Sequence, residues 1–144
     1  MASDHIPTGM RREVEERANG VCEYCHLSQE GQEARFHIDH VIPRSAGGET
    51  KIENLALSCV SCSLRKAARL TWPDPDTGDK VTLYNPRTMK WDEHFVWRGS
   101  VLVGSTSIGR ATISALNMNR PFILAIRDEE AAWGRHEPKS HGLL

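Results

Sequence analysis

Two Cys-x-x-Cys pairs are the feature that most limits what this chain can fold into. The pairs are Cys22/Cys25 and Cys59/Cys62, and they contain all four cysteines of the 144 residues. A two-residue spacer lets both sulfurs of a pair reach one ion, so two pairs predict a structural zinc ion in a tetrahedral four-thiolate site. A redox pair or buried free thiols are the alternative. The 33 residues of the intervening segment, 26–58, exceed a minimal zinc ribbon, so we expect a further unit between the pairs.

The expected compartment is the cytoplasm. The first residues carry no basic flank and no apolar segment, and a reducing compartment disfavours disulfides. The longest uninterrupted apolar stretch, 122–126, is far too short to span a bilayer, so no membrane partner is expected. With 18 Lys and Arg against 19 Asp and Glu, the formal charge of -1 excludes a strongly cationic surface. Nucleic-acid binding would therefore need local positive charge.

Local patterns predict short helices and strands along the chain. A helix is expected over 9–19 with Thr8 as its N-cap, and another over 63–70. Short extended segments are expected over 34–38 and 55–57. In the second half we expect the following elements: a turn-rich connection over 73–78, a hairpin of 94–98 with 101–103, a helix from a capping Thr106 to Asn117, and a helix over 121–133 that begins with proline.

The segment between the cysteine pairs contains the candidate chemistry. Asp39 and His40 are adjacent at the end of an expected strand. The carboxylate can hold a hard divalent cation, and an imidazole can take a proton from water near neutral pH. Asn54 is expected to orient that imidazole through its amide oxygen. Ser63 and Lys66 are spaced i, i+3 and fall on one face of the expected helix.

In these residues the chain resembles the His-Asn-His (HNH) nucleases of the ββα-metal, or His-Me finger, superfamily in their four-cysteine form. The resemblance covers about residues 11–70, where an Asp-His-x-x-Pro stretch, a Gly-Gly, a Glu-Asn-Leu and both cysteine pairs occur in the family's order. It implies an α+β fold with a ββα-metal nuclease core and zinc site over 9–71. A small mixed α/β C-terminal extension of a hairpin plus helices, over 72–144, would pack on that core. A weaker match in the extension, at Asn85-Pro86-Arg87 and Trp91-x-x-His94, carries no assigned chemistry.

The resemblance implies a bacterial endonuclease that hydrolyses DNA phosphodiester bonds, in restriction, defence or repair. His40 would be the general base, Asp39 a ligand of a catalytic Mg²⁺ or Mn²⁺, and Asn54 the residue that positions His40. The cysteines would hold structural Zn²⁺ away from the chemistry. His37 lies two residues before Asp39 on the same strand face, where it would support the metal site without binding the ion.

One residue departs from the family pattern. The residue after the last cysteine, usually Asn or His, is the second protein ligand of the catalytic metal, and here it is Ser63. Three outcomes stay open: Ser63 binds the metal directly, binds it through water, or leaves the site weak.

The expected contacts to DNA come from four basic residues, Arg44, Arg65, Lys66 and Arg69. Two other functions remain alternatives to an active nuclease. The first is a zinc-stabilised nucleic-acid-binding module whose catalytic site is weakened by Ser63. The second is a nuclease subunit that depends on a partner protein, and a homodimer is also left open.

Overall fold

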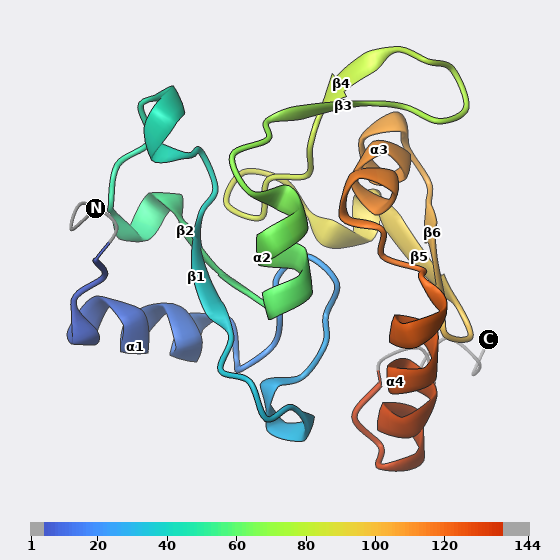
Figure 1. Ribbon diagram of the computed structural model, residues 1–144, viewed down its shortest axis with the longest axis horizontal. Helices are drawn as coiled ribbons and strands as arrows, with labels where there is room; N and C mark the ends of the chain where they lie inside the picture. Colours follow the sequence, from blue (N-terminus) through green and yellow to red (C-terminus); the bar gives the residue numbers. More distant parts are fainter. Residues whose placement is uncertain (1–4, 137–144) are drawn as a thin grey trace.

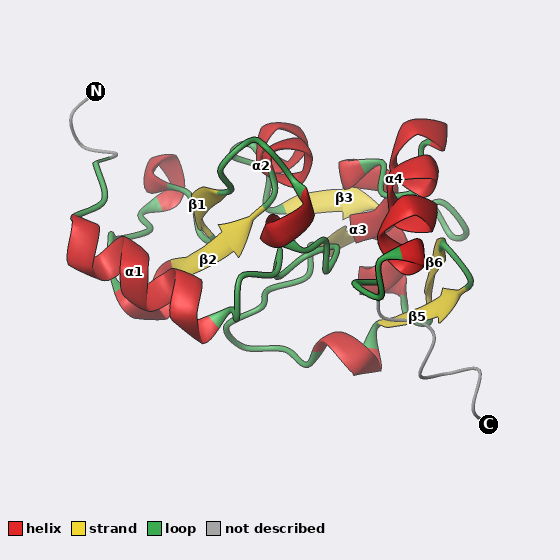
Figure 2. Cartoon of the chain, turned by 90° about the horizontal axis from the view of Figure 1, so that it is seen from below, coloured by secondary structure: helices red, strands yellow, loops and turns green. Residues whose placement is uncertain are grey.

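The computed structural model describes residues 5–136, so the expected extension is seen only as far as residue 136. Within this range, four α-helices and six short strands form a mixed α/β fold. The strands pair into three separate two-stranded antiparallel sheets, which Figure 2 shows along the length of the molecule. No helix in this range combines the length and the apolar character that crossing a membrane requires.

The first sheet and the helix after it form the centre of the N-terminal half. Strand β1 (His37–His40) pairs with β2 (Leu55–Ser58), with His37 opposite Ser58 and His40 opposite Leu55. Cys59 follows β2 directly, and its sulfur accepts the Cys62 N–H at the start of helix α2 (Val60–Lys66). Helix α2 contacts both strands on one side and α3 on the other (Figure 1). A strand pair followed by a helix therefore lies next to the second cysteine pair.

Three expected boundaries near these elements were wrong. The strand expected over 34–38 is β1 at His37–His40, and both helices also differ. Helix α1 spans Thr8–Arg17, its N-cap is Pro7, and Thr8 lies inside the helix instead of capping it. Proline is favoured near a helix start because its fixed φ suits that position. Helix α2 begins and ends earlier than the expected 63–70, because the Cys59 sulfur caps it and Ala67 adopts a φ of 47°.

The second half contains the remaining strands and helices. They are β3 (Thr71–Pro73), β4 (Lys80–Thr82), β5 (Phe95–Arg98), β6 (Val101–Gly104), α3 (Ser107–Leu116) and α4 (Pro121–Ala132). The β5–β6 hairpin, the Thr106 cap and the proline at the start of α4 are confirmed. The expected connection over 73–78 instead forms the turn of the β3–β4 hairpin, where the buried Asp74 carboxylate accepts the Asp76 N–H at 3.0 Å.

One hydrophobic core joins the two halves of the described chain. Buried side chains of the first half, such as Val14, Phe36 and Leu55, belong to the same cluster as Trp97 and Leu102 of the β5–β6 hairpin. Helix α3 also packs against α2, β3 and β4. The second half therefore contributes directly to the packing around the candidate site.

Candidate metal and nuclease site

The four cysteine sulfurs come together from two distant parts of the chain. All four side chains are buried, and their sulfur atoms lie within 4.8 Å of one another. The Sγ atoms of Cys25 and Cys59 are 3.7 Å apart. Zn–S bonds of about 2.3 Å in a tetrahedron place the sulfurs about 3.8 Å apart. The cluster therefore fits a zinc ion, as the spacing of the cysteines indicates.

The Asp39 carboxylate lies between β1 and α2 and is 8% exposed. The Tyr24 hydroxyl donates to its Oδ2 at 2.6 Å, and the Lys66 ammonium lies 3.1 Å from the same oxygen. The other oxygen, Oδ1, is 3.5 Å from the ammonium. Burial raises the pKa of this carboxyl, while Lys66 and Tyr24 oppose the shift. Both donors therefore bind Oδ2 more closely, which leaves Oδ1 the less engaged oxygen.

Lys66 does not have the environment expected for a phosphate-binding side chain. It is 2% exposed, and besides Asp39 its ammonium donates to the backbone carbonyls of Val41 at 3.0 Å and His40 at 3.3 Å. An ammonium with three acceptors around it has used its three donors. The prediction that Lys66 contacts DNA is therefore wrong, because the i, i+3 face it shares with Ser63 points into the protein. The Lys66 ammonium instead contacts the end of β1, where Asp39 and His40 lie.

His37 and Ser63 meet at the same interface between β1 and α2. Nδ1 of His37 lies 2.9 Å from the Ser63 hydroxyl oxygen, and both side chains are partly exposed. Since His37 and Asp39 alternate with Ile38 along β1, both project from one face of the strand. Carboxylate, hydroxyl and imidazole groups are donor types that Mg²⁺ or Mn²⁺ can use, so this face of β1 and α2 offers three potential ligands.

The His40 imidazole is partly exposed and has a hydroxyl partner that sequence reasoning missed. Its Nε2 lies 2.8 Å from Oγ1 of Thr50, and the Arg44 guanidinium donates to that same oxygen at 2.8 Å. Because Thr50 accepts from Arg44, its own proton is available to Nε2. If the hydroxyl donates that proton, the imidazole is the tautomer with its lone pair at Nε2; the hydroxyl's second lone pair also allows the other tautomer. No sequence pattern marks Thr50, which lies in the irregular loop between the two strands.

The Asn54 side chain hydrogen-bonds the backbone of the loop between β1 and β2 instead of the His40 imidazole. Its Oδ1 accepts the Ile42 N–H at 2.9 Å, and its Nδ2 donates to the carbonyls of Ile42 at 3.0 Å and Glu49 at 2.9 Å. Both amide hydrogens are thus used on the backbone of the loop that joins β1 to β2. The expected contact between the Asn54 amide oxygen and His40 is replaced by the contact with Thr50. These contacts of Asn54 therefore fix the backbone of the loop that also carries Thr50.

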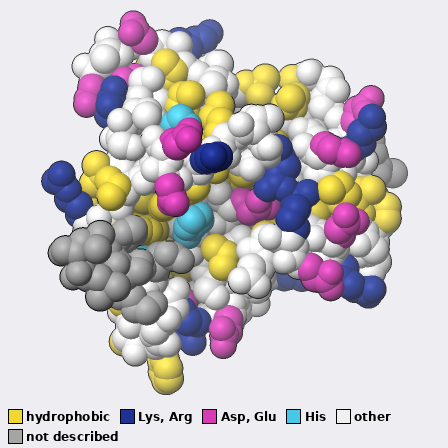
Figure 3. Space-filling model, turned by 180° about the vertical axis from the view of Figure 1, so that it is seen from behind, with side chains coloured by type: hydrophobic (Ala, Val, Ile, Leu, Met, Phe, Trp, Pro, Cys, Tyr) yellow, Lys and Arg dark blue, Asp and Glu magenta, His cyan; other side chains and the backbone are white. Residues whose placement is uncertain are grey.

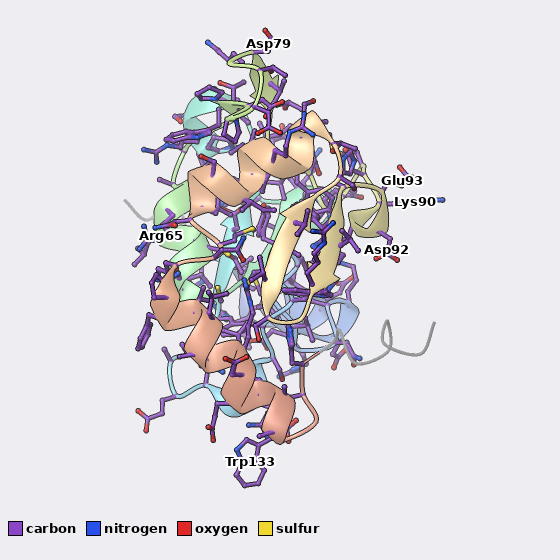
Figure 4. All side chains as sticks on the ribbon, turned by 90° about the vertical axis from the view of Figure 1, so that its right-hand side faces the viewer. Arg65, Asp79, Lys90, Asp92, Glu93 and Trp133 are labelled. Atoms are coloured by element: carbon purple, nitrogen blue, oxygen red, sulfur yellow. The ribbon has the colours of Figure 1, made fainter. Side chains whose placement is uncertain are left out.

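The three remaining candidates for DNA contact are exposed arginines. Arg44 lies in the loop after β1, Arg65 is on α2, and Arg69 follows that helix with its guanidinium over the Trp72 ring at 5.2 Å. Figure 4 shows Arg65 at the edge of the view, on the side opposite to Lys90 and Glu93. On the face shown in Figure 3, basic and acidic side chains are intermixed rather than separated. With a net charge of -1, DNA binding near α2 would depend on these three arginines.

Comparison with known proteins identifies one segment. Residues 22–69 match the family model described as HNH endonuclease. The match spans 48 of the 144 residues and includes both cysteine pairs, β1, β2 and α2. The chain matches no curated protein and no solved structure. The resemblance noted in the sequence is thus confirmed for this segment, since residues 22–69 match the HNH endonuclease family.

Proposed function

We propose that the protein is a metal-dependent endonuclease that hydrolyses DNA phosphodiester bonds. The observation that carries the proposal is the pair of adjacent residues at the end of β1: the Asp39 carboxylate faces α2, and the His40 imidazole is held at Nε2 by Thr50. A bound Mg²⁺ or Mn²⁺ would neutralise charge that grows on the phosphate during cleavage. Asp39 would hold this ion, with Ser63 and His37 next to it. The zinc site supports the fold around these residues.

His40 is the general base in this proposal. Removal of a proton from water needs a neutral imidazole, and a Thr50 hydroxyl that donates to Nε2 would keep the lone pair there. In this proposal the Arg44 guanidinium leaves Thr50 to bind a DNA phosphate. The Thr50 hydroxyl is then less firmly held, and the attacking water replaces it at Nε2 of His40. Activity is expected to rise with pH over the range in which an imidazole loses its proton.

DNA would be bound mainly through its backbone. Arg44, Arg65 and Arg69 are exposed and close to the β1–loop–α2 unit, and phosphate contacts position a protein without reading sequence. With so few cations and a net charge of -1, binding should be weak and should fall steeply with salt.

A plasmid-nicking assay with Mg²⁺ or Mn²⁺ tests the proposal. His40→Ala should abolish nicking while zinc content and circular dichroism stay at wild-type values. His5→Ala removes an exposed imidazole outside the site and serves as the matched control. Ser63→Asn should raise nicking or lower the metal concentration required. Full activity in His40→Ala would refute the assignment of the base.

A zinc-stabilised DNA-binding module without activity is the second candidate. The observation that favours it is the low exposure of Asp39 together with a serine at the second ligand position. In that case the wild-type protein would shift DNA in a binding assay but would not nick it with either metal.

A further inference from the structure

The segment of the extension that carries no assigned chemistry lies against the first cysteine pair. Arg87 forms an ion pair with Glu23, whose side chain is only 13% exposed. The Trp91 indole Nε1–H donates to the backbone carbonyl of Tyr24 at 2.8 Å. The Trp91 ring also stacks on His26, with ring centroids 3.8 Å apart and an interplanar angle of 18°. The extension therefore binds the turn that carries Cys22 and Cys25 through an ion pair, a hydrogen bond and a stacked ring.

This turn is fixed to the central sheet as well. The Glu23 carboxylate accepts the Leu57 N–H at 2.9 Å, and the Glu23 N–H donates to the Leu57 carbonyl at 2.8 Å. Leu57 lies in β2 directly opposite Ile38 of β1. The turn thus has a defined position relative to the strand that carries Asp39.

Tyr24 projects from this turn to Asp39. Its side chain is 1% exposed, and its hydroxyl donates to Asp39 Oδ2 at 2.6 Å. Lys66 approaches the same carboxylate from α2. Two donors from separate elements therefore fix the carboxylate in one orientation and leave Oδ1 less engaged. The chain of contacts runs from the extension to Tyr24 and from Tyr24 to Asp39.

We propose that Tyr24 is a positioning residue for divalent-cation binding at Asp39, and that Trp91 of the extension acts on the site through Tyr24. The inference rests on the proposed function, because it takes Asp39 as the residue that holds the cation. A carboxylate that is already oriented loses less freedom when it binds an ion. Ordering one mobile side chain on binding weakens affinity by about three- to tenfold.

Binding of Mn²⁺ to zinc-loaded protein, followed by the electron paramagnetic resonance signal of free Mn²⁺, measures this effect without any reaction. Tyr24→Phe removes only the hydroxyl and should raise the Mn²⁺ dissociation constant about three- to tenfold at unchanged zinc content. Tyr84→Phe is the matched control, because Tyr84 is also buried, packs edge-on against Tyr24 and directs its hydroxyl to the Met89 carbonyl instead. It should leave Mn²⁺ binding unchanged.

The outcomes separate the inference from the proposed function. If the wild-type protein binds Mn²⁺ and nicks plasmid but Tyr24→Phe binds Mn²⁺ equally well, the inference is refuted and the nuclease assignment stands. An equal loss of affinity in Tyr84→Phe also refutes it, because the effect would then follow from core packing. If the wild-type protein neither binds Mn²⁺ nor nicks plasmid, the proposed function fails and the inference fails with it.

A double variant tests whether Trp91 acts through Tyr24. Trp91→Phe keeps an aromatic ring next to His26 but removes the donor to the Tyr24 carbonyl. It should weaken Mn²⁺ binding less than Tyr24→Phe does. The double variant should bind Mn²⁺ no more weakly than Tyr24→Phe alone, since coupled residues are not additive. Multiplied effects in the double variant would show that Trp91 acts independently and would overturn that part of the inference.

Discussion

Replacing Lys66 with methionine would distinguish a buried structural charge from a DNA contact. Methionine keeps most of the aliphatic length and removes the ammonium. That ammonium lies 3.1 Å from Asp39 Oδ2 and donates to the carbonyls of Val41 and His40, and the lysine side chain is 2% exposed. The substitution would leave the Asp39 carboxylate buried with the Tyr24 hydroxyl as its remaining close donor.

The size of the effect follows from this burial. Removing one partner of a buried ion pair costs about 3 to 5 kcal/mol, because the other charge is left without compensation. An exposed lysine that only contacts DNA would change the free energy of unfolding by about 0.5 kcal/mol or less. Arg65→Met, on the exposed side of the same helix, is the matched control and should stay within that smaller range.

The pH dependence gives a second measure of the same variant. Burial raises the pKa of Asp39 and Lys66 lowers it, so loss of Lys66 should raise that pKa further. A carboxyl whose pKa is higher in the folded than in the unfolded state loses stability as pH rises. The deficit of Lys66→Met should therefore be small near pH 4 and grow toward neutral pH.

Urea unfolding of zinc-loaded protein, followed by tryptophan fluorescence, measures these free energies. Asp39→Asn combined with Lys66→Met should recover part of the loss, because no buried charge is then left unpaired. A deficit below about 1 kcal/mol in Lys66→Met at neutral pH would refute the buried-pair reasoning.

Three further predictions concern the loop, the β3–β4 turn and the zinc site. Gly48→Ala should abolish nicking at unchanged zinc content, because a Cβ there would lie 1.7 Å from the Ile42 carbonyl oxygen; Gly9→Ala, with no atom within 4 Å, should keep activity, and an active Gly48→Ala would contradict this account of the loop. Arg110 lowers the pKa of Asp74 to about 2, so Asp74→Asn should lower the free energy of unfolding at neutral pH. This loss of stability should shrink as pH falls from about 4 toward 2, which unfolding measured over an acid titration would show. A loss that does not change with pH would speak against the ion pair. Removal of zinc by a chelator should unfold the β1–β2–α2 unit, as seen by circular dichroism and reversed by added zinc, whereas an unchanged melting temperature would exclude a structural ion.

Elements with strong local signals were predicted correctly from the sequence. Thr106 supplies a side-chain cap to α3, Pro121 begins α4, and Gly99 with Ser100 turns the β5–β6 hairpin. Each signal acts within a few residues, so no knowledge of the rest of the fold is needed. The β3–β4 hairpin was missed because Pro73 and neighbouring turn residues are more typical of a loop than of a strand edge.

The candidate site was less accessible to sequence reasoning. The spacing of Ser63 and Lys66 places both side chains on one face of α2, but it does not say whether that face meets solvent or β1. Tyr24 lies between two zinc-ligand candidates, and nothing local shows that its hydroxyl reaches Asp39, 15 residues away. Thr50 meets His40 only because the loop folds back. These contacts depend on tertiary packing, which a single sequence does not specify locally.

Because its ammonium is enclosed, chemical labelling of Lys66 can report when α2 and β1 move apart. Amine-reactive labels need a solvent-accessible, unprotonated nitrogen, and this nitrogen is surrounded by Asp39 and two backbone carbonyls. Lysines on the surface, such as Lys51 and Lys90, would be modified at once in the native protein. The rate at which Lys66 becomes labelled, measured by mass spectrometry, would therefore report how often α2 separates from β1. No probe needs to be introduced into the protein.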